Sequence, residues 1–171
     1  MLQTSENDNK FIKNLILNAQ NGNNSAFEQL YEINVERVFS VVLRILASVE
    51  LAHKVTIDVF VHAWENLKFV RTDMSFASWL LSISVYSSLE KLRAIKKNNE
   101  NYAQDAIQGI FLKDTLDKRI LSLPENERII FVLNEIENYT IVESADLMGI
   151  TADTAKQILS RARILLINRL D

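Results

Sequence analysis

Short polar side chains and cations share one side of the segment from Thr151 to Arg163 if that segment is helical. Hydroxyl and amide groups can hydrogen-bond to base edges, and lysine and arginine bind phosphates. The residues that could face outward for these tasks are Thr151, Thr154, Lys156, Gln157, Ser160, Arg161 and Arg163. This pattern fits DNA reading and fits a charged, solvated helix about equally well.

Residues suited to catalysis or metal binding are scarce. The chain of 171 residues has no cysteine and two histidines, His53 and His62, and neither histidine has a carboxylate or second histidine placed to form a catalytic pair. No glycine-rich phosphate loop, no nucleophile with a base and no metal-ligand cluster is found. We therefore expect no enzyme, no cofactor, no metal and no small-molecule substrate.

Helices must position the polar segment, because three glycines and one proline leave few places to break them. An all-α fold is predicted. Thr140 and Glu143 form a capping-box pattern that opens a short helix ending at Gly149, and Thr151 can cap the next helix. This pair predicts a helix-turn-helix whose second helix buries Ala155, Ile158, Leu159, Ala162, Leu165 and Leu166.

Four helices are predicted before residue 98: Phe11 to Ala19, one from Phe27, one from near Glu50, and one after the cap Ser75. The polar stretch 98–113 is interpreted as a linker with at most one helical turn. Beyond it, a helix is expected to begin with Pro124 at its first position, ahead of the helix-turn-helix. The predicted organisation is two small helical domains, 1–97 and 114–171, joined by the linker 98–113.

The charge is unevenly distributed. The net charge of −3 argues against general nucleic-acid binding, so any DNA contact must come from local patches.

The acidic, polar start and the absence of about 20 uninterrupted apolar residues predict neither secretion nor membrane insertion. A cytoplasmic protein is expected.

Several motifs resemble one family of transcription factors. Ala26 to Glu32 (AFEQLYE), Asp58 to Trp64 (DVFVHAW) and Ser75 to Leu80 (SFASWL) resemble region 2 of bacterial RNA polymerase sigma factors of the extracytoplasmic-function (ECF) group. Leu123 to Leu133 (LPENERIIFVL) and Ser160 to Arg163 (SRAR) resemble region 4 of the same family. The order and spacing of the motifs match as well.

The resemblance implies a factor that binds core RNA polymerase and directs promoter-specific initiation, commonly restrained by an anti-sigma factor. The first domain would bind the polymerase clamp and melt the downstream promoter element, and the second would read the upstream element. The implied polymerase contacts are Ile57, Asp58, Val61 and His62, on a helix side that we place opposite Trp64. The implied contacts to melted DNA are Lys68, Phe69, Arg71, Lys91, Arg93, Lys96 and Lys97.

The chain departs from the family pattern at several of these surfaces. Polar or basic family residues are replaced by Ile57 on the polymerase side and by Ala77, Val85, Tyr86 and Ile158 on the DNA sides, and Lys54 replaces an acid. Each lost phosphate contact weakens salt-dependent DNA binding. An alternative is therefore a sigma-like regulator that binds polymerase or an anti-sigma factor without reading promoter DNA.

Overall fold

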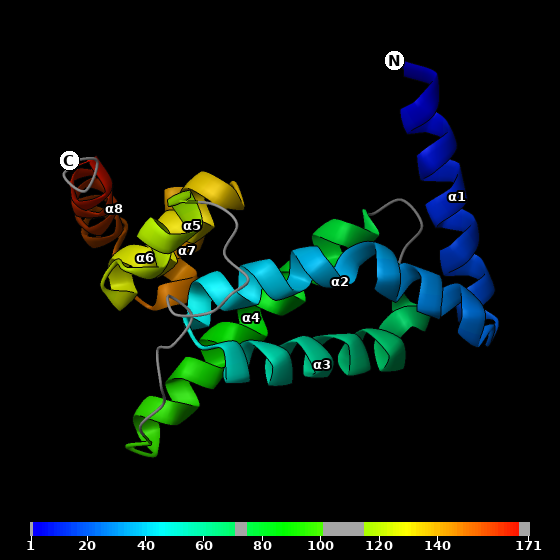
Figure 1. Cartoon of the computed structure of the whole chain (residues 1–171), viewed down its shortest axis with the longest axis horizontal. Coiled ribbons are helices and arrows are strands. Elements are labelled where there is room, and N and C mark those ends of the chain that lie inside the picture. Colours follow the sequence, from blue (N-terminus) through cyan, green and yellow to red (C-terminus); the bar gives the residue numbers. More distant parts are fainter. Residues whose placement is uncertain (1, 71–74, 101–114, 168–171) are drawn as a thin grey trace.

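The computed structural model describes residues 2–70, 75–100 and 115–167, and all regular elements in these ranges are helical, as predicted. Figure 1 shows two groups of helices packed side by side. The first group comprises α1 (Leu2–Gln20), α2 (Asn24–Leu46), α3 (Val49–Asn66), the 3-10 turn η1 (Leu67–Phe69) and α4 (Phe76–Lys97). The second comprises α5 (Thr115–Leu121), α6 (Glu125–Phe131), the π-helical turn η3 (Val132–Ile136), α7 (Ile141–Met148) and α8 (Ala152–Ile167).

Polar caps fix where the helices of the first group begin. The side chain of Asn23 accepts a hydrogen bond from the Ala26 amide at 3.1 Å, and Ser75 accepts one from the Ser78 amide at 3.4 Å. Between α2 and α3, Ala47 adopts a left-handed conformation with φ 53°, and Ser48 then caps α3. Such caps satisfy amides that have no partner inside their own helix.

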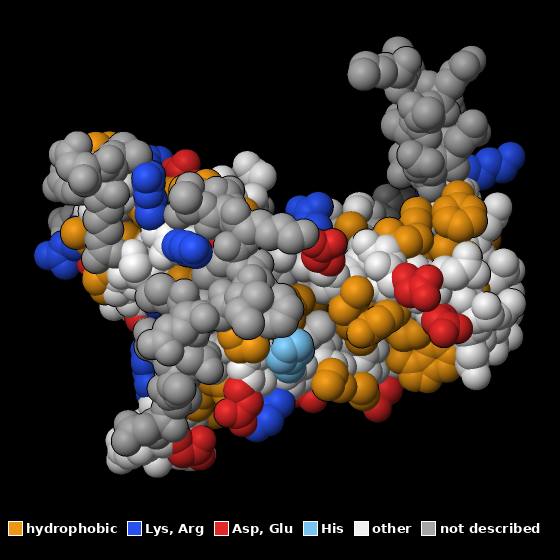
Figure 2. Space-filling model, in the orientation of Figure 1, with side chains coloured by type: hydrophobic (Ala, Val, Ile, Leu, Met, Phe, Trp, Pro, Cys, Tyr) orange, Lys and Arg blue, Asp and Glu red, His pale blue; other side chains and the backbone are white. Residues whose placement is uncertain are grey.

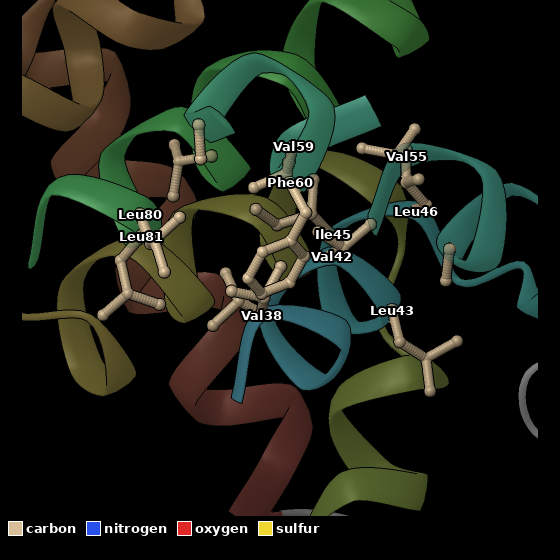
Figure 3. Close-up of a cluster of buried hydrophobic side chains, with 14 of the residues drawn as sticks. Val38, Val42, Leu43, Ile45, Leu46, Val55, Val59, Phe60, Leu80 and Leu81 are labelled. Atoms are coloured by element: carbon tan, nitrogen blue, oxygen red, sulfur yellow. The ribbon is translucent and has the colours of Figure 1, made fainter. Parts of the chain in front are cut away.

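The main core lies between α2, α3 and α4, where Val42, Val59 and Leu80 are fully buried. Figure 3 shows these side chains within one cluster of buried hydrophobic residues. The same buried cluster continues into the second group of helices through Ile120, Ile129 and Leu133. Burial of apolar surface therefore stabilises the contact between the two groups as well as each group itself.

Two smaller clusters hold the second group together. Ile130 of α6 packs with Ala145, Ala155 and Leu159, and Leu123 packs with Ala162 and Leu166. The predicted inner face of the last helix is confirmed, because Ala155, Leu159, Ala162 and Leu166 are buried and Ile158 and Leu165 are half-buried. None of the helices described here is long and apolar enough to cross a membrane.

Three details of the predicted elements were wrong. α1 extends beyond the expected range, and α5 was not expected as a helix. Pro124 is the N-cap of α6, with φ −54° and ψ 153°, and not its first helical residue. A ψ of 153° is extended and not helical, so α6 begins one residue later, at Glu125.

Candidate functional site

Backbone and side-chain caps fix the turn between α7 and α8. Thr140 Oγ1 accepts from the Glu143 amide at 3.2 Å, while Glu143 Oε2 accepts from the Thr140 amide at 2.7 Å, which completes the predicted capping box. α7 ends at Gly149, whose φ of 68° is left-handed, and the Ile150 amide donates to the Ala145 carbonyl at 3.0 Å. Glycine reaches this conformation without a Cβ clash, so the chain can turn at once into α8.

α8 presents its polar residues to solvent. The Thr154 amide donates to Thr151 Oγ1 at 3.2 Å, which caps the first turn. The structure brings together on the exposed side all the residues that the sequence assigns to DNA: Thr151, Thr154, Lys156, Gln157, Ser160, Arg161 and Arg163. A helix-turn-helix of this kind can lay the start of its second helix in the major groove.

The cations of this surface pair with neighbouring acids. Lys156 Nζ lies 3.2 Å from Asp153, and Arg161 Nη1 lies 3.2 Å from Glu127. Arg163 pairs with Glu135 of η3. Ion pairs of exposed side chains contribute about 0–1 kcal/mol each, so Lys156 and Arg163 can exchange a carboxylate for a phosphate at low cost. The Glu127 side chain is only 8% exposed, so a move of Arg161 to a phosphate would leave a buried carboxylate without this partner.

Two of the noted departures fall on positions that are buried or half-buried. Val85 is 1% exposed in α4 and belongs to the main core. Ile158 is half-buried and packs beside Ile130, Ala145 and Leu159. An apolar residue at either place stabilises the fold, whereas Tyr86 is 59% exposed and remains a surface departure.

The residues assigned to melted DNA do not form one patch. Phe69 is exposed in η1, with Lys68 Nζ 5.0 Å from its ring centroid, and η1 packs against α1 and α3. Arg71 lies outside the described residues. Lys91, Arg93, Lys96 and Lys97 lie in the last turns of α4, where Arg93 donates to the Leu147 carbonyl of α7. Phe76 is the first residue of α4, and Lys91 lies fifteen residues further along that helix. At the helical rise, the two positions are about 22 Å apart along the helix axis.

An apolar groove of about 490 Å³ opens between α2 and α3. Ile57, Val61 and Trp64 line it and are 63%, 51% and 41% exposed, and Asp58 and His62 lie exposed beside them. Phe27 and Tyr31 form the opposite wall, with the Phe27 and Trp64 ring centroids 4.9 Å apart. Figure 2 shows apolar side chains gathered over these two helices.

This groove corrects the sequence interpretation. Trp64 was placed on the side opposite Ile57 and Val61, but all three line the same groove. Phe27, Tyr31 and Trp64 were assigned only to packing faces, although Ile57, Val61 and Trp64 are spaced four and three apart, as residues on one helix face are. Their apolar character hid their exposure, because a core residue and an exposed apolar anchor look alike in a sequence.

A polar pocket separates the two groups of helices near Glu137. It is lined by Arg37, Ser78, Leu81, Glu137, Asn138, Tyr139 and Glu143. Burial raises the pKa of the Glu137 carboxyl, an effect that the positive charges of Arg37 and Arg44 only partly offset. Burial and then the charges of Glu137 and Glu143 raise the pKa of Tyr139, and hydrogen bonds from Thr140 lower the pKa of Glu143. Within the described part of the chain, no three potential ligand residues gather in a way that could hold a metal ion.

Comparison with known proteins agrees with this architecture. Residues 113–166, which include the helix-turn-helix, match the family described as Sigma-70, region 4. The chain is 23% identical over 175 residues to the ECF RNA polymerase sigma factor SigW of Bacillus subtilis strain 168, covering 89% of this chain and 92% of that protein. It is 26% identical over 170 residues to the ECF RNA polymerase sigma-E factor of Escherichia coli K12, covering 87% and 88%.

A solved structure is also similar. The sigma factor RpoE, in complex with the anti-sigma factor NepR from Bartonella quintana, has a TM-score of 0.56 at 19% identity and covers 84% of this chain and 96% of that one. This likeness supports the fold of two helical units.

The fold and the family match show an all-helical protein whose helix-turn-helix segment is similar to sigma-70 region 4. More particularly, the resemblance to the ECF group predicted from the sequence is confirmed along nearly the whole chain. The relatives are sigma factors, which are not enzymes.

Proposed function

We propose that this chain is an ECF-type sigma factor that binds core RNA polymerase and directs promoter-specific initiation without catalysing a reaction itself. The observation that carries the proposal is the match of residues 113–166 to sigma-70 region 4, since it falls on a fully capped helix-turn-helix with an exposed polar face. The likeness to named ECF sigma factors along the rest of the chain supports the same role for the first group of helices.

We assign residues 1–97 to polymerase binding and promoter melting, 98–113 to the linker, and 114–171 to upstream promoter recognition. On α3, the exposed Ile57, Asp58, Val61 and His62 form the polymerase-binding face. A surface that combines large exposed apolar side chains with a polar edge is typical of protein interfaces. The groove beside it enlarges the apolar area available to the polymerase.

For DNA, we assign base contacts to the first turns of α8, through Thr151, Thr154 and Gln157, and phosphate contacts to Lys156, Arg161 and Arg163. Ser160 lies between them on the same exposed side. The exposed Phe69 is a stacking surface for an unpaired base, and Lys68 beside it supplies positive charge. Lys91, Arg93, Lys96 and Lys97 would bind the backbone of the downstream element.

An anti-sigma factor is the second proposed protein partner. The similar sigma factor RpoE was solved in complex with the anti-sigma factor NepR, and the exposed apolar groove supports a further protein contact on this chain. A factor that serves RNA polymerase would work in the cytoplasm.

The test combines binding and transcription. Purified protein is mixed with core RNA polymerase at moderate salt, and co-migration and transcripts from a pool of genomic promoter fragments are measured. We expect both. No binding to core polymerase would rule the proposal out.

Paired variants locate the two surfaces. The double variant Ile57→Ser, Val61→Ser of α3 should abolish co-migration with core polymerase. The control Ile33→Ser changes an exposed isoleucine of α2 and should leave co-migration intact. Lys156→Ala should weaken promoter binding across sequences and lower the slope of log affinity against log salt by about 1. The control Lys118→Ala removes an exposed lysine of α5 and should leave that slope unchanged.

A sigma-like regulator that does not read promoters is the second candidate, favoured by the acidic neighbours of all three α8 cations. Such a protein would bind core polymerase or an anti-sigma factor and yield no transcript. Transcripts that start at specific promoters would exclude it.

A further inference from the structure

The polar pocket near Glu137 has the size of a small-molecule site. Its volume is about 370 Å³, within the range of about 300–1,000 Å³ that such sites span. Arg37 of α2 and Leu81 of α4 line it from the first group of helices, and the segment from Glu137 to Tyr139 lines it from the second. None of its lining residues is assigned above to polymerase or DNA. The two proposed surfaces therefore leave this pocket without a role.

Glu137 is a buried carboxylate whose partner is distant. Its side chain is 4% exposed, and Nη2 of Arg37 lies 3.8 Å from its Oε2. A charge-assisted hydrogen bond between N and O is about 2.7–2.9 Å long, so this pair does not form one. Arg37 is 61% exposed and offsets only part of the burial that raises the pKa of Glu137. A cation that donated directly to the carboxylate would stabilise its ionised form more strongly.

The backbone holds Glu137 in place at the pocket. Glu137 follows the π-helical turn η3, and its amide donates to the Val132 carbonyl at 3.0 Å. The Tyr139 amide donates to the Leu133 carbonyl at 2.9 Å, and Asn138 between them is left-handed with φ 58°. Single π-helical turns are frequent at functional sites. A carboxylate that is fixed before binding loses little conformational freedom when a ligand arrives.

The charge of the pocket favours a cation. Glu143 Oε2 accepts from the amide and from the hydroxyl of Thr140, each at 2.7 Å, and these hydrogen bonds lower the pKa of Glu143 and keep it ionised. The lining residues then include two carboxylates, Glu137 and Glu143, and one guanidinium, Arg37. A ligand with one positive charge would make the pocket neutral.

We propose that the pocket binds a small organic cation, a primary ammonium group on a short alkyl chain. Such a group has three N–H donors. The pocket offers acceptors for them in the carboxylate of Glu137, the hydroxyl of Ser78 and the amide oxygen of Asn138. The alkyl chain lies against Leu81 and the ring of Tyr139. The inference does not depend on the proposed function, because the site shares no residue with the polymerase and DNA surfaces.

Nuclear magnetic resonance of the isotope-labelled natural chain tests the site with n-butylammonium chloride. At about pH 8 a glutamate is ionised and an alkylammonium group is protonated. We expect the amide signals of Asn138 and Tyr139 to shift and to saturate. n-Butanol has a chain of the same length and no charge, so its affinity should be about tenfold lower. Sodium chloride keeps the ionic strength equal in the two titrations.

Two variants should change the affinity for n-butylammonium in opposite directions. Glu137→Gln keeps the shape of the side chain and removes its charge, so affinity should fall about tenfold. Arg37→Gln removes the cation that competes for Glu137, so affinity should rise. The control Glu32→Gln removes an exposed carboxylate of α2 and should have no effect. If Glu137→Gln does not fold, the comparison of n-butylammonium with n-butanol on the natural chain still decides.

A primary ammonium group occurs both in free alkylamines and at the end of a lysine side chain. Nα-Acetyl-lysine amide presents the same group on a peptide unit and distinguishes the two sources. Binding as tight as that of n-butylammonium would identify a lysine side chain as a ligand. Weaker binding would assign the pocket to free amines, and both results support an ammonium site.

Two results would overturn the proposal. One is the absence of saturable shifts at Asn138 and Tyr139, and the other is equal affinity of the natural chain for n-butylammonium and n-butanol. Failure of the proposed function would appear separately, as absence of binding to core polymerase, which takes no part in these titrations.

Discussion

Thr56 lies in α3 with 5% of its surface exposed and its hydroxyl oxygen without a hydrogen-bond partner. A buried polar group left unpaired costs about 1–3 kcal/mol. Valine has nearly the same shape and no hydroxyl, so Thr56→Val should raise the free energy of unfolding by about 1 kcal/mol. Urea unfolding followed by circular dichroism measures the change.

Ser84 is the matched control, since its hydroxyl is also buried but donates to the Leu80 carbonyl at 2.7 Å. Ser84→Ala removes a satisfied group, and we expect no gain in stability. If Thr56→Val is no more stable than the natural protein, the hydroxyl of Thr56 has a partner in solution.

At this residue scale, the sequence predicted the polar side of α8 and missed the groove. The residues from Thr151 to Arg163 alternate with apolar residues at helical spacing, so their exposure follows from the period. Trp64 and Tyr31 carry no such signal, because only the packing of α2 against α3 decides whether an aromatic ring is covered. Val85 could be recognised as a core position only once α4 was seen packed against its neighbours.

The cap of α7 is the clearest test at the scale of elements. Thr140 Oγ1 holds the Glu143 amide, and Thr140→Ala leaves that amide without its side-chain partner. The substitution should lower the free energy of unfolding by about 1 kcal/mol. The control Ser87→Ala removes a hydroxyl from the middle of α4, where no cap is lost, and should be within about 0.5 kcal/mol of the natural protein. Equal stability of both variants would contradict the role of the cap.

Element boundaries were predictable where a polar cap marks them and unpredictable where tertiary contacts set them. Ser75, Thr140 and Gly149 were identified from their residue types, and the structure places them at helix ends. α5 has only seven residues and depends on burying Ile120 and Leu121 against the first group of helices. Isolated helices of that length are unstable in water, so local sequence could not reveal it.

For the whole molecule, composition indicated a linker but not how the two groups of helices meet. The polar stretch 98–113 predicts a boundary, yet Ile129 and Leu133 share one buried cluster with α2 and α4. The contact between the two groups also includes a buried arginine, Arg128, which donates to the Ile45 carbonyl of α2. In the sequence, Arg128 is one residue of the motif Leu123 to Leu133, and nothing there indicates that it is buried. Residues distant in sequence determine this packing, and their pairing has no periodic signature.

Glu137 offers a test of the contact between the groups through pH. Its side chain is 4% exposed, and burial raises its pKa above the ordinary 4.5 more than Arg37 lowers it. Over the pH range from 4.5 to the raised value, the folded protein keeps a proton that the unfolded chain releases, so stability falls as pH rises through that range. Glutamine does not ionise, so Glu137→Gln should become progressively more stable relative to the natural protein. Urea unfolding from about pH 4 to about pH 7 measures this difference, and Glu32→Gln is the exposed control. A difference that stays constant or shrinks with rising pH would show that Arg37 outweighs burial at this contact.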